Sequence, residues 1–495
     1  MNDPADPVGP RAGISVDPVV RALGAEAAAV LPAALTEAWG RPVAVGGVHR
    51  LSGGASRQTF RVDLTLGDAN GDLTGDHGRG QTGDPVGRSA APGAPPGSVI
   101  VQRERPGSVG ANLPMPAQVA LLRAAATSGV PVPAVLAEGG GRGSAFVVLE
   151  ELAGESVARR ILRDDAFAAA RGGLARQAGR ILAAVHRIPL DTTSLPGGDP
   201  LQQMTALLDL LGEPPPAFER GLRWLAANRP PARDEVVVHG DFRMGNLLVA
   251  PDGVTAVLDW ELAHRGAAAE DLGWFCGRAW RFGSPHRAGG VGTLDALLAG
   301  YGEAGGEVPS PHEVTWWEAY GTLRWGLICV LQASVHLRGD HRSVELAAIG
   351  RRASECEEDL LELVAGPSDY EPLPAAEADP PAGPHDRPTA VELLDAVGEH
   401  LELLRGTLEG AAAFHLRVTG NVVAMVAREV ALGPAQAAAH AERLARLDVA
   451  DEGALARAVR AGELDADLDA VTALVREDVR DKLVVAHPGY WRGDG

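Results

Sequence analysis

The stretch VVVHGDFRMGNLLVAPDGVTAVLDWE, residues 236–261, decides the predicted fold of this chain. Within it, Asp241 lies on a polar turn, Asn246 follows five residues later, and Asp259 comes thirteen residues after that. A carboxylate beside an amide and a second carboxylate suits phosphoryl transfer. That reaction needs a base for the attacking hydroxyl and oxygen ligands for Mg²⁺. The alternative is an Asp/Asn-rich turn between two strands with no chemical role.

Two apolar, β-branched runs, 236–238 and 254–258, flank the polar residues of this stretch. We expect two short strands joined by a turn, which would bring the three polar side chains together at one opening of the fold.

The order His-Gly-Asp, five residues to Asn, then Asp-x-Glu resembles the aminoglycoside phosphotransferase and choline kinase superfamily. The resemblance implies an α+β, two-lobed protein-kinase-like fold, with a small β-rich N-lobe and a mostly helical C-lobe, and ATP and Mg²⁺ as cofactors. It implies that Asp241 is the catalytic base, and that Asn246 and Asp259 hold the metal. For His239 we favour a brace of the catalytic loop over acid/base work.

Composition narrows the class of protein. With 495 residues the chain should hold two or three domains, and a formal net charge of −20 argues against nucleic acid or an anionic membrane as partner. Its three widely spaced cysteines match no zinc or redox pattern, and the sequence offers no leader and no run approaching 18 apolar residues. We therefore predict a cytoplasmic protein with buried thiols.

Glycine- and proline-rich segments divide the chain. We expect a helix over about 20–38, another over 117–128, a helical Trp-rich stretch from Trp316 to His336, and a helix from Phe414 that ends at Gly433-Pro434. The predicted organisation is a disordered tail (1–15), an N-lobe (16–152) with a flexible insertion (67–98), a C-lobe (153–365), a linker (366–388) and a small all-α accessory domain (389–495).

The remaining nucleotide contacts are assigned through the same resemblance. The phosphate-covering loop would be Ser52, Gly53, Gly54, Ala55 and Ser56, whose glycines let backbone N–H groups approach phosphate. Two adjacent glycines also suit a plain hairpin turn.

Arg103 stands where protein kinases have a strand lysine that pairs with phosphate. Gln118 stands where that lysine's glutamate partner is expected, and an amide cannot neutralise a cation. The hinge that meets adenine through its backbone would be Glu150, Glu151 and Leu152.

Two acidic residues follow the metal positions. Glu261 belongs to the Asp-Trp-Glu variant, where a role at the second metal or the substrate and a surface or helix-capping role are equally open. Asp271, in AEDLGWF, is expected to cap a helix and tie down the catalytic loop.

Three segments, RRIL (159–162), RAWRFG (278–283) and RWGLIC (324–329), look most like the branch fused to some acyl-CoA dehydrogenases. The implied activity is phosphorylation of a hydroxyl group, on a hydroxy acid or hydroxyacyl-CoA, with an acyl-CoA dehydrogenase as a possible pathway partner. The end of the chain resembles an uncharacterised helical domain found after such phosphotransferases. A nucleotide-binding pseudokinase scaffold and an aminoglycoside phosphotransferase are the alternatives.

The net charge of residues 276–352 bears on which class of acceptor the protein would bind. Residues 276–352 hold eight Arg against seven Asp and Glu, a net charge of 8 − 7 = +1 within a chain of −20. This suits an anionic acceptor better than a polycationic aminoglycoside, although arginines in surface salt bridges would give the same count.

Overall fold

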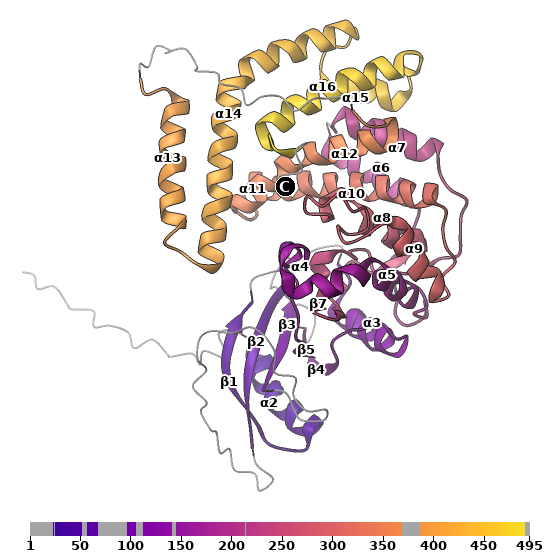
Figure 1. Cartoon of the computed structure of the whole chain (residues 1–495), viewed down its shortest axis with the longest axis vertical. Coiled ribbons are helices and arrows are strands. Elements are labelled where there is room, and N and C mark those ends of the chain that lie inside the picture. Colours follow the sequence, from indigo (N-terminus) through magenta and orange to yellow (C-terminus); the bar gives the residue numbers. More distant parts are fainter. Residues whose placement is uncertain are drawn as a thin grey trace, which may run out of the picture. The chain divides into compact units, whose positions relative to one another are not determined.

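The computed structural model describes residues 23, 25–51, 57–67, 97–104, 112–140, 145–212, 214–368 and 387–490, which form two compact units (Figure 1). The first unit lies within residues 1–126 and 132–153, and the second within 127–131 and 154–495. The predicted phosphate loop, Ser52 to Ser56, and nearly all of the predicted insertion lie outside the described residues.

The first unit is built on a five-stranded antiparallel sheet in the order β1-β2-β3-β5-β4. Its strands are β1 (Val43–Arg50), β2 (Arg57–Leu66), β3 (Ser98–Glu104), β4 (Val135–Gly139) and β5 (Phe146–Glu150). β2 and β3 are neighbours with Val62 opposite Val99, so the predicted insertion joins adjacent antiparallel strands.

One face of this sheet is apolar because every second residue of its central strands is large and hydrophobic. Helix α2 (Ala25–Trp39) packs on that face, and a second helix, α3 (Met115–Thr127), follows the sheet's third strand. The buried residues of this core are Leu23, Ala27, Leu31, Leu35, Val43, Phe60, Val62, Val99, Val101, Phe146 and Val148.

The second unit is mostly helical, and together with the β-rich first unit it confirms the predicted α+β fold class. Its first helices are α4 (Ala158–Arg163), α5 (Ala168–Val185), α6 (Pro200–Leu211), α7 (Pro216–Ala227), α8 (Ala268–Cys276), α9 (Leu294–Glu303), α10 (Pro311–Leu337), α11 (Val344–Ile349) and α12 (Ala353–Ala365). The Trp-rich stretch is helical, as predicted.

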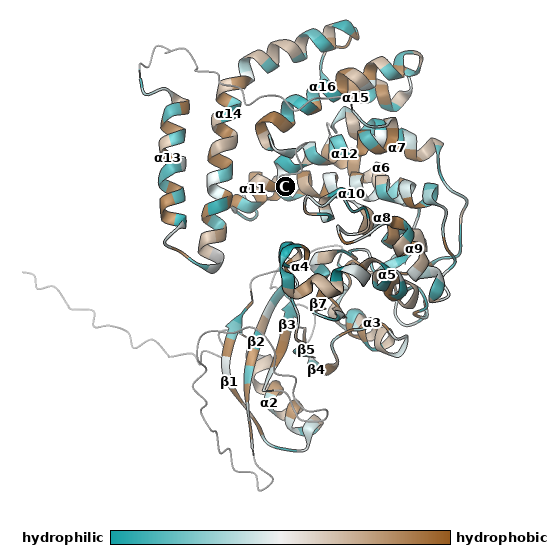
Figure 2. Cartoon of the chain, in the orientation of Figure 1, coloured by the Kyte–Doolittle hydropathy of each residue, from teal (hydrophilic) through white to brown (hydrophobic). Residues whose placement is uncertain are grey.

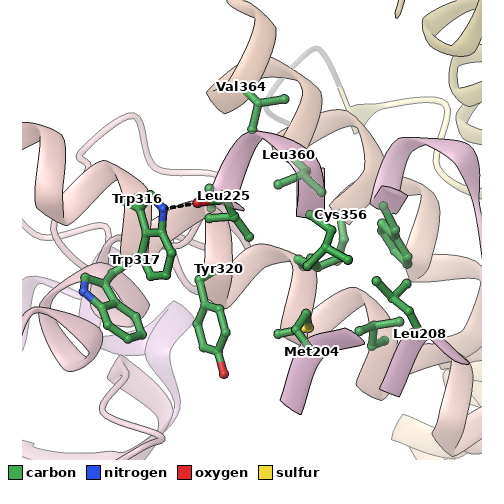
Figure 3. Close-up of a cluster of buried hydrophobic side chains, with 14 of the residues drawn as sticks. Met204, Leu208, Leu225, Trp316, Trp317, Tyr320, Cys356, Leu360 and Val364 are labelled. Carbon is green, nitrogen blue, oxygen red and sulfur yellow. Dashed lines mark hydrogen bonds between the residues drawn. The ribbon is translucent and has the colours of Figure 1, made fainter. Parts of the chain in front are cut away.

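A hydrophobic core of this unit lies among α6, α7, α10 and α12 (Figure 3). Trp316 is buried there, and its indole N–H donates to the carbonyl of Leu225 at 2.9 Å, so the polar atom of this buried ring is satisfied. Cys356 lies in the same core, and all three cysteines are buried free thiols.

The predicted hairpin of the catalytic stretch is wrong. β6 (Val236–Val238) pairs with β9 (His264–Gly266), whereas β8 (Gly253–Val257) pairs with β7 (Leu247–Ala250), so the two apolar runs belong to different two-stranded sheets. Each run finds a partner strand that the sequence analysis did not assign, because β7 and β9 are short and carry weak alternation.

The helices after residue 387 are α13 (Ala390–Arg405), α14 (Gly410–Arg446), α15 (Glu452–Ala461) and α16 (Leu468–Ala486). The predicted end at Gly433-Pro434 is wrong, because α14 continues through Pro434. A proline removes one helical hydrogen bond, and the helix bends rather than stops (Figure 1).

The α13 and α14 helices expose several large hydrophobic side chains, including Leu403 and Phe414. Hydrophobic and hydrophilic residues alternate along both helices (Figure 2). Within the described chain, one segment, Ala412–Arg446, is long and apolar enough to span a membrane by length and composition alone. Polar residues interrupt it, which is why the sequence shows no continuous apolar run. A single helix of this kind is weak evidence for a membrane span.

The last helices share a hydrophobic core with the lobe that precedes them. Their apolar residues pack on α7 and α12, and the members of this core are Ala217, Leu361, Leu444, Leu455, Val459, Val471, Val475, Val479 and Leu483. Ion pairs join the same elements: Arg460 of α15 with the buried Glu219, Lys482 of α16 with the buried Glu357. That residues 389–495 form a separate accessory domain stays a prediction. The shared core shows that the last helices pack directly on α7 and α12.

We expect Arg460→Met to lower the free energy of unfolding by about 1–3 kcal/mol, because it leaves the carboxylate of Glu219, 1% exposed, without its charged partner. The matched control is Arg457→Met on the same helix. Arg457 reaches Asp451 only at 4.0 Å, and both side chains are about two-thirds exposed or more, so we expect a change within about 0.5 kcal/mol. Urea denaturation measures both, and equal destabilisation by the two variants would contradict the assignment.

Candidate active site

The catalytic loop leaves β6 at His239 and turns sharply at Gly240. Gly240 has a φ of +78°, and a side chain there would collide with the carbonyl of Leu262. Only glycine adopts this conformation at little cost, so the turn depends on it. The loop then enters the short 3₁₀ helix Met244–Asn246, which buries Asn246.

His239 is fully buried, and both of its ring nitrogens bond to backbone. Nδ1 accepts from the N–H of Asp241 at 3.2 Å, so the proton lies on Nε2, which donates to the carbonyl of Leu258 at 3.0 Å. Burial lowers the pKa of His239 despite the nearby carboxylates, which keeps the ring neutral. This geometry is that of a brace joining the catalytic loop to the residue before Asp259.

Asp271, in the first turn of α8, holds the other side of the loop. Its two carboxylate oxygens accept the backbone N–H groups of His239 and Gly240, at 2.8 and 2.9 Å. It does not cap α8, because the N-cap position is Ala267; the expected cap is therefore wrong, and the expected tie to the loop is confirmed.

A buried chain of polar side chains backs Asp271. His186 lies 3.2 Å from its Oδ2 and 2.9 Å from the hydroxyl of Tyr301. Burial raises the pKa of Asp271, but the interactions with His186 and His239 together bring the pKa below its ordinary value. The carboxylate therefore stays ionised although it is fully buried.

Asp241 is held by three side-chain donors. Its Oδ1 accepts from Arg243 Nε and from Trp274 Nε1, each at 3.0 Å, and its Oδ2 accepts from Asn246 Nδ2 at 2.6 Å. A carboxylate has about four acceptor positions. Among the described residues no donor takes the fourth, on Oδ2, which is where a substrate hydroxyl could bind.

Asn246 and Asp259 fit a Mg²⁺ site in the chemistry of their donors. The amide nitrogen of Asn246 donates to both Oδ2 and the backbone carbonyl of Asp241, so its amide oxygen remains as the atom for a metal. Asp259 adopts a left-handed φ of +63°, which is uncommon for a residue other than glycine and turns the chain directly after Leu258.

Sequence reasoning missed Trp274 as a neighbour of Asp241. Asp271 and Trp274 are three residues apart and so share one face of α8, which supplies both the loop's anchor and a donor to its carboxylate. That spacing within AEDLGWF was the available signal.

In the first unit the structure does not join Arg103 to Gln118. Arg103 Nε donates to Gln58 on β2 at 2.6 Å, while the buried Gln118 donates to the carbonyl of Leu113. The side chain bonded to Arg103 in this structure is therefore Gln58, and nucleotide binding by Arg103 and Gln118 stays a prediction.

The proposed hinge follows β5. Glu150 uses its backbone N–H in a bond to the carbonyl of Ala134 at 2.9 Å, and the Glu151 carboxylate accepts from Arg61 at 2.8 Å and contacts Ser98. Leu152 comes next and is half-buried. The side chain of Glu151 thus fixes the strand end to the sheet, and adenine contact by 150–152 stays a prediction.

The arginines counted within 276–352 are largely paired with acids. Arg281 and Arg287 both bond to the buried Glu318, and Arg324 lies 3.4 Å from Glu270. Further ion pairs join Arg278 with Asp359 and Glu362, Arg338 with Asp340, Arg351 with Glu429, and Arg352 with Glu355. A local net charge of +1 therefore gives no argument for an anionic acceptor.

The pKa values of two histidines beside the catalytic loop shift in opposite directions, that of His239 downward and that of His264 upward. The folded-state pKa of His239 is lowered, so its contribution to stability is complete above about pH 6.5 and is lost as pH falls toward the folded value. Burial lowers the pKa of His264, but the charge and hydrogen bond of Glu270 raise it above its ordinary value. The contribution of His264 to stability is therefore present below about pH 6.5 and is lost as pH rises through the folded value.

NMR titration of the ring protons, assigned with His239→Gln and His264→Gln, checks this order. A midpoint for His239 above that for His264 would contradict it.

Comparison with known proteins found similar sequences and structures. Residues 84–317 match the phosphotransferase enzyme family, and residues 406–490 match a domain of unknown function, DUF6285. A solved structure of a candidate aminoglycoside phosphotransferase from Ralstonia eutropha JMP134 is 22% identical, with a TM-score of 0.48, and the match covers 66% of this chain and 93% of that one.

Two curated relatives match shorter stretches. Acyl-CoA dehydrogenase family member 10 of Mus musculus is 31% identical over 174 residues, 32% of this chain and 16% of the mouse protein. Acyl-CoA dehydrogenase family member 11 of Gallus gallus is 45% identical over 62 residues, 12% of this chain and 8% of the chicken protein. The chain thus spans a small part of either relative. This chain is thus similar to the phosphotransferase enzyme family over residues 84–317, within its α+β fold, and to DUF6285 over residues 406–490.

Proposed function

We propose that this protein is a Mg²⁺- and ATP-dependent phosphotransferase that phosphorylates a hydroxyl group of a small molecule. The observation that carries the proposal is the state of Asp241. Three donors fix its carboxylate, and one acceptor position on Oδ2 is left for a hydroxyl group. A positioned carboxylate of this kind can orient an attacking hydroxyl and accept its proton in the transition state.

Each remaining residue has a defined task. His239 and Asp271 keep the loop backbone in place, which fixes where Asp241 stands. Asn246 and Asp259 would hold Mg²⁺, which when bound neutralises charge on the nucleotide phosphates. In the first unit, Arg103 and the loop from Ser52 to Ser56 are proposed to bind phosphate oxygens, and the backbone of 150–152 to meet adenine.

For the acceptor we propose a hydroxy acid or a hydroxyacyl-CoA. Support comes from the likeness to two proteins named acyl-CoA dehydrogenase family members, and an acyl-CoA dehydrogenase is accordingly the proposed pathway partner. The buried free thiols and the charge of −20 support the proposed cytoplasmic location.

A nucleotide-binding scaffold without catalysis is the second candidate. Its support is Gln118, which carries no charge and is bonded to Leu113 rather than to a phosphate-pairing cation. The intact set of Asp241, Asn246 and Asp259 favours catalysis.

Substitution of Asp259 and substitution of Asp241 should impair the protein in different ways. We expect Asp259→Ala to weaken nucleotide binding in the presence of Mg²⁺, because a metal ligand is lost. Asp241→Asn should leave that binding unchanged and lower phosphoryl transfer by about 10²- to 10⁴-fold, because the base is lost. Calorimetry with ATP and Mg²⁺ and a turnover assay measure both. Asp252→Asn, an exposed carboxylate on the β7–β8 turn, is the control for loss of charge. Equal loss of nucleotide binding in both site variants would refute the assignment.

Acceptor choice can be tested with a panel. We expect ATP consumption to rise with a hydroxy acid or a hydroxyacyl-CoA and to stay at background with aminoglycosides. ADP formation with Mg²⁺-ATP measures this, with Asp241→Asn as the control for acceptor-independent signal. Turnover of kanamycin-like acceptors without turnover of any hydroxyacyl thioester would place the protein with the resistance enzymes.

A further inference from the structure

We infer that Trp274 is a positioning residue for Asp241, and that its indole N–H sets the orientation of the catalytic carboxylate. The inference rests on the proposed phosphotransferase function. Its basis is the bond from Trp274 Nε1 to Asp241 Oδ1 at 3.0 Å, made by a ring that is 4% exposed. A buried indole N–H needs a partner, and here the partner is the reacting carboxylate.

The ring of Trp274 is held from two helices. Gly321 of α10 lies under it, and a side chain at Gly321 would come within 3.0 Å of the ring. Gly273 lets α8 approach α10, since a side chain there would come within 2.6 Å of Trp317 and Glu318. The two glycines therefore allow the close packing of α8 and α10 that places the indole at Asp241.

Charged groups complete the setting of Trp274. The guanidinium of Arg324 lies 5.6 Å from its ring centre, and Arg324 lies 3.4 Å from Glu270, one turn earlier on α8. A cation over an indole face is attracted to the ring electrons, so this contact holds the plane of the ring.

The second donor to Oδ1 is supported by the same aromatic group. Arg243 stacks over Trp280 at 4.9 Å, and Trp280 contacts both Trp274 and Trp325, with ring centres 5.2 and 4.9 Å apart. Both donors to Oδ1 are therefore set by one cluster, Trp274, Trp280 and Trp325, which we call the tryptophan cluster.

Two donors on one oxygen matter because the terminal torsion of an aspartate is soft and broad. Of the two carboxylate oxygens, Asn246 bonds only to Oδ2, so without the donors on Oδ1 this one bond would limit rotation about Cβ–Cγ. Trp274 and Arg243 on Oδ1 remove that rotation and aim the remaining acceptor position of Oδ2 in one direction. Loss of Trp274 should therefore lower the rate of transfer and leave nucleotide binding intact.

The test compares Trp274→Phe with Trp316→Phe. Trp316 also loses a buried indole bond, of 2.9 Å to Leu225, but it lies in the core of α6, α7, α10 and α12 and makes no contact with the catalytic loop in the described residues. We expect Trp274→Phe to lower kcat for Mg²⁺-ATP turnover roughly tenfold to a hundredfold, with nucleotide affinity unchanged. Trp316→Phe should retain wild-type kcat at a temperature where both variants are folded.

A spectroscopic readout tests the bond without relying on activity. The indole ¹H–¹⁵N resonance missing from Trp274→Phe is that of Trp274. In Asp241→Ala this resonance should shift, while the one missing from Trp316→Phe should stay in place. An unshifted Trp274 resonance would overturn the inference whatever the activity.

The outcomes separate the inference from the function on which it rests. If Asp241→Asn lowers turnover and Trp274→Phe behaves like Trp316→Phe, the positioning role fails and the proposed function stands. If the wild-type chain and Asp241→Asn turn over ATP equally, the proposed function fails and the positioning role fails with it.

Discussion

The catalytic loop depends on one carboxylate, that of Asp271. Its oxygens accept the N–H groups of His239 and Gly240, two buried donors that no strand partner satisfies because β6 ends at Val238. An unsatisfied buried donor costs about 1–3 kcal/mol, so the loop conformation would be unfavourable without this acceptor. His186, the C-cap residue of α5, and Tyr301 of α9 extend the same network, so three helices help to fix one turn of backbone.

α8 concentrates these tasks. Its first turn carries Asp271, where the positive end of the helix dipole favours a negative charge, and its next turn carries Trp274. A shift of α8 would therefore move the backbone of the loop and the donor to its carboxylate together. The glycine contacts between α8 and α10 make such a shift difficult, because there is no space for either helix to slide closer.

The sequence predicted what depends on local pattern. The α3 and α10 helices follow from periodicity and from glycine and proline stops, whereas the α+β class followed from the family resemblance. Strand partners could not be predicted, because β7 and β9 are four and three residues long and carry almost no pattern. Pro434 predicts a helix end, but a bent helix can keep its packing against neighbours while it loses one hydrogen bond.

Prediction of the candidate site from the sequence was limited in the same way. Spacing alone identified Asp241, Asn246 and Asp259 as chemically important, and that assignment awaits experiment. Side-chain partners could not be predicted from spacing. Arg103 bonds to Gln58, and the arginines near Glu318 and Glu270 form ion pairs with these buried carboxylates. A count of charges along the chain does not say which of them face a ligand.

The core shared by α7, α12, α15 and α16 has a consequence for synthesis on the ribosome. Ala217 and Leu361 emerge long before Leu483, which completes their packing. At typical elongation rates the intervening chain takes on the order of ten seconds to make. Throughout that interval the nascent lobe presents an uncovered apolar face to chaperones, and a prematurely terminated chain would retain that face permanently.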